Sequence, residues 1–294
     1  MNPATETCCC CGVPLREGLA PWHRECAACG YERAHLEPSI NEAAVHGTLD
    51  EGLRDAGLKS LREDNFRALL DRVGGLHPGA QWLDVGAAHG WFVQQARQRG
   101  YDTLGLEPDE QVRAQANRAG AGLRGGYFPQ ALHGGERFDV IVFNDVFEHI
   151  PDAAGTLQAC HDRLQPGGLL VLNLPSSRGV FFRTSKVLWR LGLHGFFERL
   201  WQKGLPSPHL HYFHAGNLAR LARRHGFDAL DEFHLPSVRV RGLWQRIASV
   251  RGGTRLSAPV VWLAVVLAYP LLAVLPADID VVVFRRAGAA PGGG

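Results

Sequence analysis

Apolar and polar residues alternate along the chain in two periods, one typical of strands and one typical of helices. FDVIVFN (138–144) is a short, β-branched apolar run of the kind that forms a strand buried on both faces. The apolar residues of 61–73 instead fall on one helical face, and Gly74-Gly75 should end that helix. The same patterns predict further strands at 81–86, 102–107, 167–175 and 278–286, and further helices from 91 to 100, from about 109, and over 153–164.

Because strands and helices alternate, the sequence predicts an α/β fold with a doubly wound, mostly parallel sheet. In such a sheet, ligands bind at the carboxyl ends of the strands, near the point where the strand order reverses. Four segments should therefore meet at one site, namely 84–90, Glu107, 144–149 and the end of the strand at 167–175.

Six of the seven cysteines lie within the first 29 residues and include two Cys-x-x-Cys pairs. Fourteen residues separate Cys8 and Cys11 from Cys26 and Cys29, and a glycine follows each pair, which lets backbone amides turn towards the sulfurs. Four thiolates at this spacing suit a tetrahedral zinc ion in a structural ribbon. The alternative ligands lie nearby in the sequence and are Cys9, Cys10 and His23.

The first predicted strand of the sheet runs into a glycine turn, LDVGAAHG, before a helix. Gly86 and Gly90 stand four apart, whereas a dinucleotide pyrophosphate needs three glycines at the spacing G-x-G-x-x-G. Glu107 ends the next strand 21 residues after Gly86, where it can accept hydrogen bonds from an adenosine ribose. S-adenosylmethionine has no phosphate, and its amino group needs an acidic partner such as Asp84. The turn therefore favours S-adenosylmethionine over NAD.

Four motifs in register carry a family resemblance: LDVGAAHG, LGLEP, FDVIVFNDVFEHIPD and LQPGGLLVLNLP. Over about 79–175 the sequence resembles the class I S-adenosylmethionine-dependent methyltransferases, and it looks most like the group that includes ubiquinone-pathway O-methyltransferases. HLHYFHAGNLARLARRHGF (209–227) is similar to that group's segment before the sixth strand. The resemblance implies a seven-stranded Rossmann-like sheet. It also implies these cofactor contacts: Asp84, Gly86 and Gly90 at the methionine end, Ala88 in place of the usual middle glycine, Glu107 at the ribose, and Asn144 and Asp145 flanking the cofactor.

Methyl transfer from a sulfonium releases a neutral thioether, so the protein mainly has to align the acceptor and exclude water. An oxygen or nitrogen acceptor must also lose a proton, and histidine titrates in a suitable range. His149, just after the strand at 138–144, is the first candidate base. His211 is the second candidate, although His209 and His214 lie beside it. A carbon acceptor or an already ionised group would need no base.

Two segments outside the predicted core combine basic, aromatic and apolar residues. Residues 178–205 carry six basic residues, six aromatic residues and one acid, and residues 233–277 carry five arginines and no acid. The uncharged run 256–277 is long enough to span a membrane, but it contains three prolines and precedes a strand that must rejoin the sheet. Two interpretations stay open, a pocket cover with an ordinary apolar core or an interfacial element on anionic lipid.

A formal net charge of +2 does not demand a nucleic-acid partner. The first residues show no secretion-signal pattern, so we expect a cytoplasmic protein. If the apolar insertion lies on anionic lipid, the protein would be peripheral at the membrane. The leading function is methyl transfer to a small-molecule acceptor, lipid-like or quinone-like. The alternatives are a non-catalytic membrane adaptor and an RNA base methyltransferase. The RNA alternative is considered because large-subunit rRNA guanine methyltransferases also look like a zinc module joined to this fold.

The expected parts are a zinc ribbon (1–38), a helical lead-in (39–78), the cofactor-binding core (79–177), a basic and aromatic lid (178–208), the last strands of the sheet (209–288) with an insertion (236–277), and a flexible tail (289–294).

Overall fold

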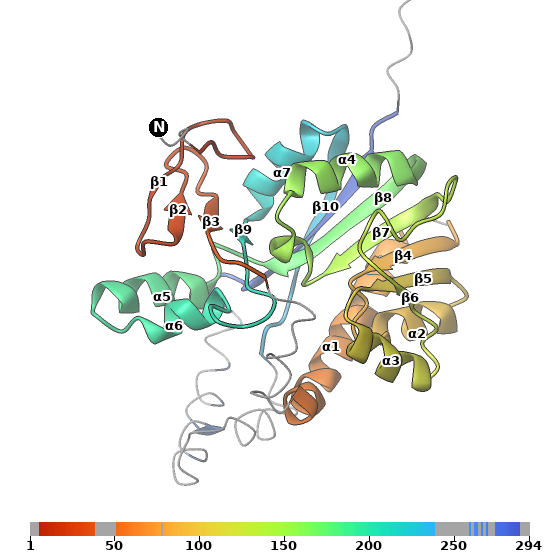
Figure 1. Cartoon of the computed structure of the whole chain (residues 1–294), viewed down its shortest axis with the longest axis horizontal. Coiled ribbons are helices and arrows are strands. Elements are labelled where there is room, and N and C mark those ends of the chain that lie inside the picture. The colour runs from red at the N-terminus through yellow and green to blue at the C-terminus, as the bar shows by residue number, and fades with distance from the viewer. Residues whose placement is uncertain are drawn as a thin grey trace, which may run out of the picture.

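The computed structural model of the protein describes residues 6–38, 51–77, 79–238 and 274–288, and five single positions between 259 and 269. In these residues the chain forms a seven-stranded sheet covered by helices on both faces, with a smaller four-stranded sheet beside it (Figure 1). The predicted doubly wound, mostly parallel sheet is confirmed.

The main sheet has the strand order β10-β11-β8-β7-β4-β5-β6. Strands β4 to β8 run parallel to one another, whereas β11 pairs antiparallel with both β8 and β10. The chain winds from β4 to one edge and returns to β7, so the strand order reverses between β4 and β7. Its strands are β4 (Gln81–Val85), β5 (Asp102–Glu107), β6 (Arg124–Gly125), β7 (Phe138–Asn144), β8 (Leu164–Pro175), β10 (Phe227–Leu235) and β11 (Ile279–Arg286).

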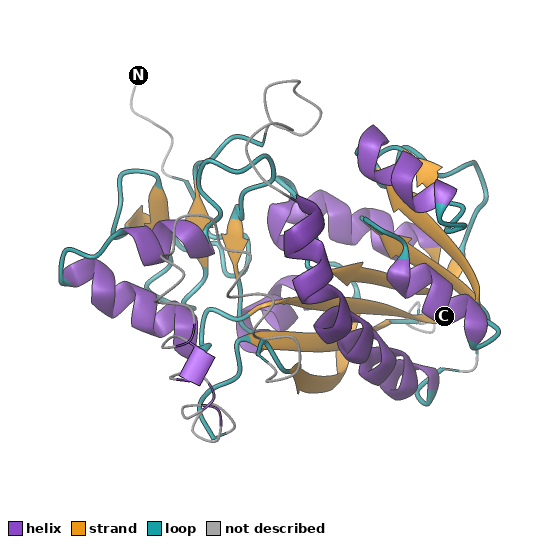
Figure 2. Ribbon diagram, turned by 90° about the horizontal axis from the view of Figure 1, so that it is seen from below, coloured by secondary structure: helices purple, strands orange, loops and turns teal. Residues whose placement is uncertain are grey.

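Helices cover the sheet in two layers (Figure 2). Side chains alternate along each strand, so a buried strand packs against both layers. In β11, Val281 and Val283 pack into one core, whereas Val282 and Phe284 pack into the core on the opposite face. The first layer contains α1 (Glu51–Gly74), α2 (Trp91–Gln98) and α3 (Glu110–Arg118), and the second contains α4 (Ala153–Arg163) and α7 (Ala215–Arg223).

The small sheet joins the amino-terminal ribbon to the core. Its first three strands are β1 (Arg16–Glu17), β2 (His23–Glu25) and β3 (Glu32–Ala34), and its fourth, β9 (His211–Tyr212), comes from the distant segment before α7. Strand β3 pairs antiparallel with β9, and the N–H of Ala34 donates a hydrogen bond of 2.9 Å to the carbonyl of Leu210. The sequence patterns predicted the ribbon and the segment before α7, but they did not predict that the two share a sheet.

Helices α5 (Val180–Arg190) and α6 (Gly195–Leu200) form a hairpin beside the ribbon (Figure 1). Phe182, Phe197 and Trp201 are fully buried there, and Trp22 of the ribbon stacks on Phe197 with ring centroids 5.7 Å apart. These aromatic residues therefore form an ordinary core between the ribbon and the hairpin. The outer edge of the hairpin exposes Val187, Leu191, Leu193 and Phe196, with exposed fractions from 38% to 71%.

The predicted apolar insertion at 236–277 lies largely outside the described residues. Within the described parts of the chain, every helix is too short or too polar to cross a bilayer.

The adjacent residues Phe196 and Phe197 offer a matched test of this packing. Phe197→Ala should lower the free energy of unfolding by about 3–5 kcal/mol, because it leaves a cavity among buried aromatic rings. Phe196→Ala removes the same atoms from an exposed site and should have a much smaller effect. Urea unfolding of both variants measures the difference, and equal destabilisation would contradict the described burial.

Candidate active site and metal centre

The glycine turn after β4 sits at the point where the strand order reverses. Gly86 has a φ of 74°, and a Cβ atom there would lie only 2.6 Å from a methyl of Val146, so a side chain does not fit. Ala88 has a φ of 44°, in the left-handed region that favours glycine, and its N–H donates to Glu107 Oε2 at 2.8 Å. Gly90 forms the N-cap of α2. The turn thus directs backbone groups towards the end of β5.

Glu107 ends β5 and connects the glycine turn to the loop that follows β5. Its second oxygen accepts a hydrogen bond of 2.8 Å from the N–H of Asp109. The side chain is buried, and burial raises the pKa of its carboxyl. Two backbone donors therefore fix this carboxylate in the place expected for a ribose partner.

Three polar side chains cross the parallel strands in a row. Asn144 Nδ2 donates to Asp84 Oδ1 at 3.2 Å, and Asn173 Nδ2 donates to Asn144 Oδ1 at 3.3 Å. Burial raises the pKa of Asp84 to about 7, although the hydrogen bond from Asn144 opposes this shift. An acid with this pKa binds a cation more tightly when it ionises.

A cavity of about 90 Å³ opens at the carboxyl ends of β4 and β7. It brings together five of the predicted cofactor residues, namely Asp84, Gly86, Ala88, Asn144 and Asp145. Asp145 also has a left-handed φ of 54°, so two non-glycine residues with this unusual backbone conformation line one cavity, as at many functional sites. Glu107 and Gly90 lie outside its lining, although Glu107 is bonded to Ala88 at its wall.

Arg62 of α1 also lines the cavity, although no motif in the sequence marks it as a site residue. Burial raises the pKa of Asp145, and the positive charge of Arg62 opposes this increase. The cavity therefore offers a cation and two acids to one ligand. Only the packing of α1 on the sheet brings Arg62 here, because no motif of the turn includes it.

A cluster of buried titratable side chains adjoins the cavity. His149, on the 3₁₀ helix Phe147–His149, has its Nδ1 2.9 Å from the carbonyl of Pro208. Nδ1 therefore carries the proton, and the lone pair lies on Nε2, which is 3.9 Å from Glu148 Oε1. His209 Nε2 lies 4.0 Å from the same oxygen. The ligand atoms of these three residues all lie within 4.8 Å of one another, so the cluster could accept a proton or hold a cation.

The environment keeps this cluster uncharged. Burial, strengthened by the negative charge of Asp145, raises the pKa of Glu148 well above its usual value. Burial lowers the pKa of His149, and it lowers the pKa of His209 further. At neutral pH both imidazoles are therefore neutral, and His149 keeps a free lone pair.

His211, the second predicted base, lies at the joint between ribbon and core. Its Nδ1 bonds the hydroxyl of Tyr31, and its Nε2 lies 2.9 Å from the carbonyl of Ile150. Nε2–H therefore donates to Ile150 and Nδ1 accepts from Tyr31, which leaves neither nitrogen for a substrate.

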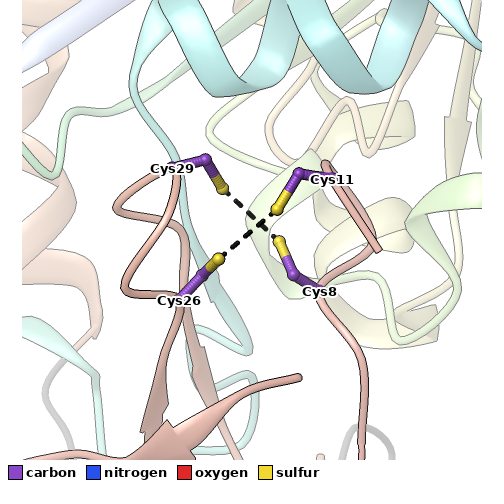
Figure 3. Close-up of side chains that lie close together, drawn as sticks. All are labelled: Cys8, Cys11, Cys26 and Cys29. Carbon is purple, nitrogen blue, oxygen red and sulfur yellow. Dashed lines mark hydrogen bonds between the residues drawn. The ribbon is translucent and has the colours of Figure 1, made fainter. Parts of the chain in front are cut away.

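The four predicted cysteines converge at one end of the ribbon (Figure 3). Cys8 Sγ lies 3.5 Å from Cys29 Sγ, and Cys11 Sγ lies 3.4 Å from Cys26 Sγ. Zinc–sulfur bonds of about 2.3 Å in a tetrahedron place the sulfurs about 3.8 Å apart, so a small expansion of this cluster accommodates the ion. The cysteines therefore fit zinc.

The backbone around the cysteines has matching turns. Gly12 and Gly30 both adopt a left-handed φ, and their N–H groups donate to the carbonyls of Cys8 and Cys26. Of the alternative ligands, Cys9 and Cys10 lie outside the group of four sulfurs that converge. His23 has both nitrogens engaged, by the N–H of Leu19 and by the carboxylate of Glu32.

Comparison with known proteins gives a consistent result. Residues 58–232 match a family described as a methyltransferase domain. A ubiquinone biosynthesis O-methyltransferase of Pseudomonas aeruginosa is 29% identical over 150 residues, which are 47% of this chain and 62% of that protein. A protein of the same name from Psychrobacter cryohalolentis is 31% identical over 105 residues, which are 32% of this chain and 40% of that protein. The matches thus span less than two thirds of these relatives.

Among solved structures, one similar chain comes from the complex between the Trm112 methyltransferase activator and a methyltransferase of Haloferax volcanii. The match covers 82% of this chain and 96% of that chain, with a TM-score of 0.53 and 14% identity. This likeness shows the fold.

We expect purified, reduced protein to carry one zinc ion per chain. Cys26→Ser combined with Cys29→Ser should abolish zinc binding. Cys9→Ser is the matched control, because Cys9 lies outside the four-sulfur cluster, and it should retain the metal. Elemental analysis of the three proteins measures the stoichiometry. Absence of zinc from the unmodified protein, or its loss from Cys9→Ser, would contradict this ligand set.

Proposed function

Because the chain belongs to the class I S-adenosylmethionine-dependent methyltransferase family, we propose that it transfers the methyl group of S-adenosylmethionine to a small-molecule acceptor. The cavity between the ends of β4 and β7 carries this proposal, since it places a cation and two acids at the point where the strand order reverses. We also propose that the four-cysteine cluster holds a structural zinc ion.

The residues of the cavity suit the charges of this cofactor. Arg62 would pair with the methionine carboxylate, and Asp84 would accept from the ammonium group. Glu107 would accept from the ribose hydroxyls, since each carboxylate oxygen has a lone pair beyond its present backbone bond. When bound, S-adenosylmethionine supplies a methyl group activated by the positive charge of its sulfur.

His149 is the proposed base for an acceptor hydroxyl. Its Nδ1–H is held by Pro208, so Nε2 can take the proton. Burial lowers the pKa of His149, which keeps Nε2 unprotonated at neutral pH. His211 was the second candidate in the sequence, and its engaged nitrogens favour a structural role.

The relatives that bear the name ubiquinone biosynthesis O-methyltransferase support a hydroxylated, quinone-like acceptor. Such an acceptor is apolar and resides in membranes. The exposed apolar edge of the α5–α6 hairpin, formed by Val187, Leu191, Leu193 and Phe196, supports contact with a membrane surface. We therefore propose that the protein meets its acceptor at a membrane.

Cofactor affinity should depend on pH through Asp84. The pKa of Asp84 is raised to about 7, and only the carboxylate attracts the ammonium group, so affinity should fall as pH decreases through 7. For a single group, the dissociation constant should rise about eightfold between pH 7.5 and pH 6. Calorimetric titration with S-adenosylmethionine measures this change.

Asp84→Asn is the control for this pH dependence. The asparagine of this variant cannot ionise, so the variant should bind S-adenosylmethionine more weakly at pH 7.5 and lose most of the pH dependence of its affinity. The nearby Glu107, whose pKa is also raised, would account for any pH dependence that remains. An unchanged pH profile in this variant would remove Asp84 from the ammonium site, and absence of cofactor binding by the unmodified protein would overturn the proposed function.

The two histidine candidates can be separated by substitution. His149→Gln should lower kcat by about 10²–10⁴-fold with a catechol acceptor, without changing cofactor affinity. His211→Phe should instead lower the melting temperature, while folded protein keeps its kcat, because the two ring nitrogens of His211 are engaged by Tyr31 and Ile150. Production of S-adenosylhomocysteine measures kcat, and a parallel assay with a chelator separates a base from a bound cation. The reverse pattern would assign the base to His211.

A further inference from the structure

A second, larger cavity of about 840 Å³ lies between the ribbon, α5 and α7. It shares no lining residue with the cofactor cavity. We call it the basic cleft, because four cations and one acid line it within the described residues. The residues that matter here are Arg178, Arg183, Lys186, Arg220, Ser177 and Glu32.

The charges of the basic cleft are unbalanced. Lys186 Nζ lies 2.7 Å from Glu32 and 3.2 Å from Glu25, so its charge is neutralised within the protein. Glu32 is engaged by Lys186 on one oxygen and by His23 on the other. Across the described residues, no hydrogen bond or ion pair engages the guanidinium groups of Arg178, Arg183 and Arg220. Among the described residues, three positive charges therefore face this cavity without a bonded counter-charge.

The walls of the basic cleft are fixed to one another. His214 Nε2 and Asn217 Nδ2 both donate to the carbonyl of Cys29, at 3.0 and 3.3 Å. His214 Nδ1 also accepts hydrogen bonds from the first turn of α7, and Arg220 lies further along the same helix. The N–H of Ser177 donates to the carbonyl of Phe213, which holds the segment before α5. The arginines thus project from elements held in position by the ribbon, so they are preorganised for a ligand.

We propose that the basic cleft binds a phosphate or diphosphate group. Guanidinium groups form paired, charge-assisted hydrogen bonds to phosphate oxygens, and several of them around one cavity match an anion with more than one charge. Ser177, which can donate through its hydroxyl, also lines this cavity. A single carboxylate would leave most of this charge unbalanced.

Helix α5 connects the basic cleft to the exposed apolar edge of the hairpin. Arg183, Val187 and Leu191 are spaced four residues apart and follow one stripe of the helix, with about 6 Å between successive positions. Arg183 faces the cleft, whereas Val187 and Leu191 are 53% and 71% exposed. A lipid would place its phosphate among the arginines and its chains along this stripe. A water-soluble phosphate compound would use only the cleft.

The test uses the full chain and two probes. Inorganic pyrophosphate, titrated by calorimetry, reports on the cleft alone, and flotation with phosphatidylcholine vesicles containing phosphatidic acid reports on lipid-borne phosphate. Arg183→Gln combined with Arg220→Gln should weaken pyrophosphate binding at least about tenfold. Arg118→Gln combined with Arg223→Gln removes the same charge from exposed sites outside the cleft and should leave binding unchanged.

Val187→Asp combined with Leu191→Asp separates the two sources of phosphate. If the source is a lipid, this variant should lose flotation and keep pyrophosphate binding, whereas Arg183→Gln with Arg220→Gln should lose both. Pyrophosphate binding without flotation of the unmodified protein would support the cleft and assign it to a soluble phosphate compound. If the unmodified protein bound neither pyrophosphate nor the vesicles, the proposal would be overturned. Binding that the Arg183 and Arg220 changes leave intact would overturn it as well. Cofactor titration of every variant verifies its folding, and only a failure there would count against the methyltransferase proposal.

Discussion

The pairing of β3 with β9 is the interaction on which the rest of the structure depends. It ties the ribbon to a segment of the core about 180 residues further along, and the hydrogen bond from Tyr31 to His211 reinforces it. Because the ribbon is held there, its aromatic residues can bury Phe182 and Trp201, which positions the α5–α6 hairpin. The same placement sets Cys29 against α7 and so encloses the basic cleft.

The central sheet could be predicted from sequence because its signals are local. β5 and β7 have the predicted bounds. The apolar run Val140–Phe143 makes β7 recognisable as a strand buried on both faces. The cysteine cluster could also be predicted from the sequence, because its members come in two short motifs. Most of the predicted cofactor residues meet in one cavity, because parallel strands end at the same edge of a sheet.

The remaining features depend on contacts between distant segments, which periodicity does not encode. Arg62 reaches the cavity only because α1 packs on the sheet, and α1 begins ten residues before its predicted start. The histidine-rich segment HLHYFH gave no basis for separating its members by role. In the folded chain His209 lies beside Glu148, His211 bonds Tyr31, and His214 caps a helix. The aromatic residues of 178–208 had two interpretations, and burial against the ribbon makes most of them core.

The long sequence separation across the β3–β9 joint affects how the chain folds during its synthesis. The ribbon leaves the ribosome first, but its partner strand follows about 180 residues later. At typical rates of translation this delay lasts roughly 10 to 40 s. Throughout that interval the ribbon has no docking surface, and its six cysteines are open to oxidation. Metal capture by the nascent segment would protect four of these thiols before the ribbon can dock on the core.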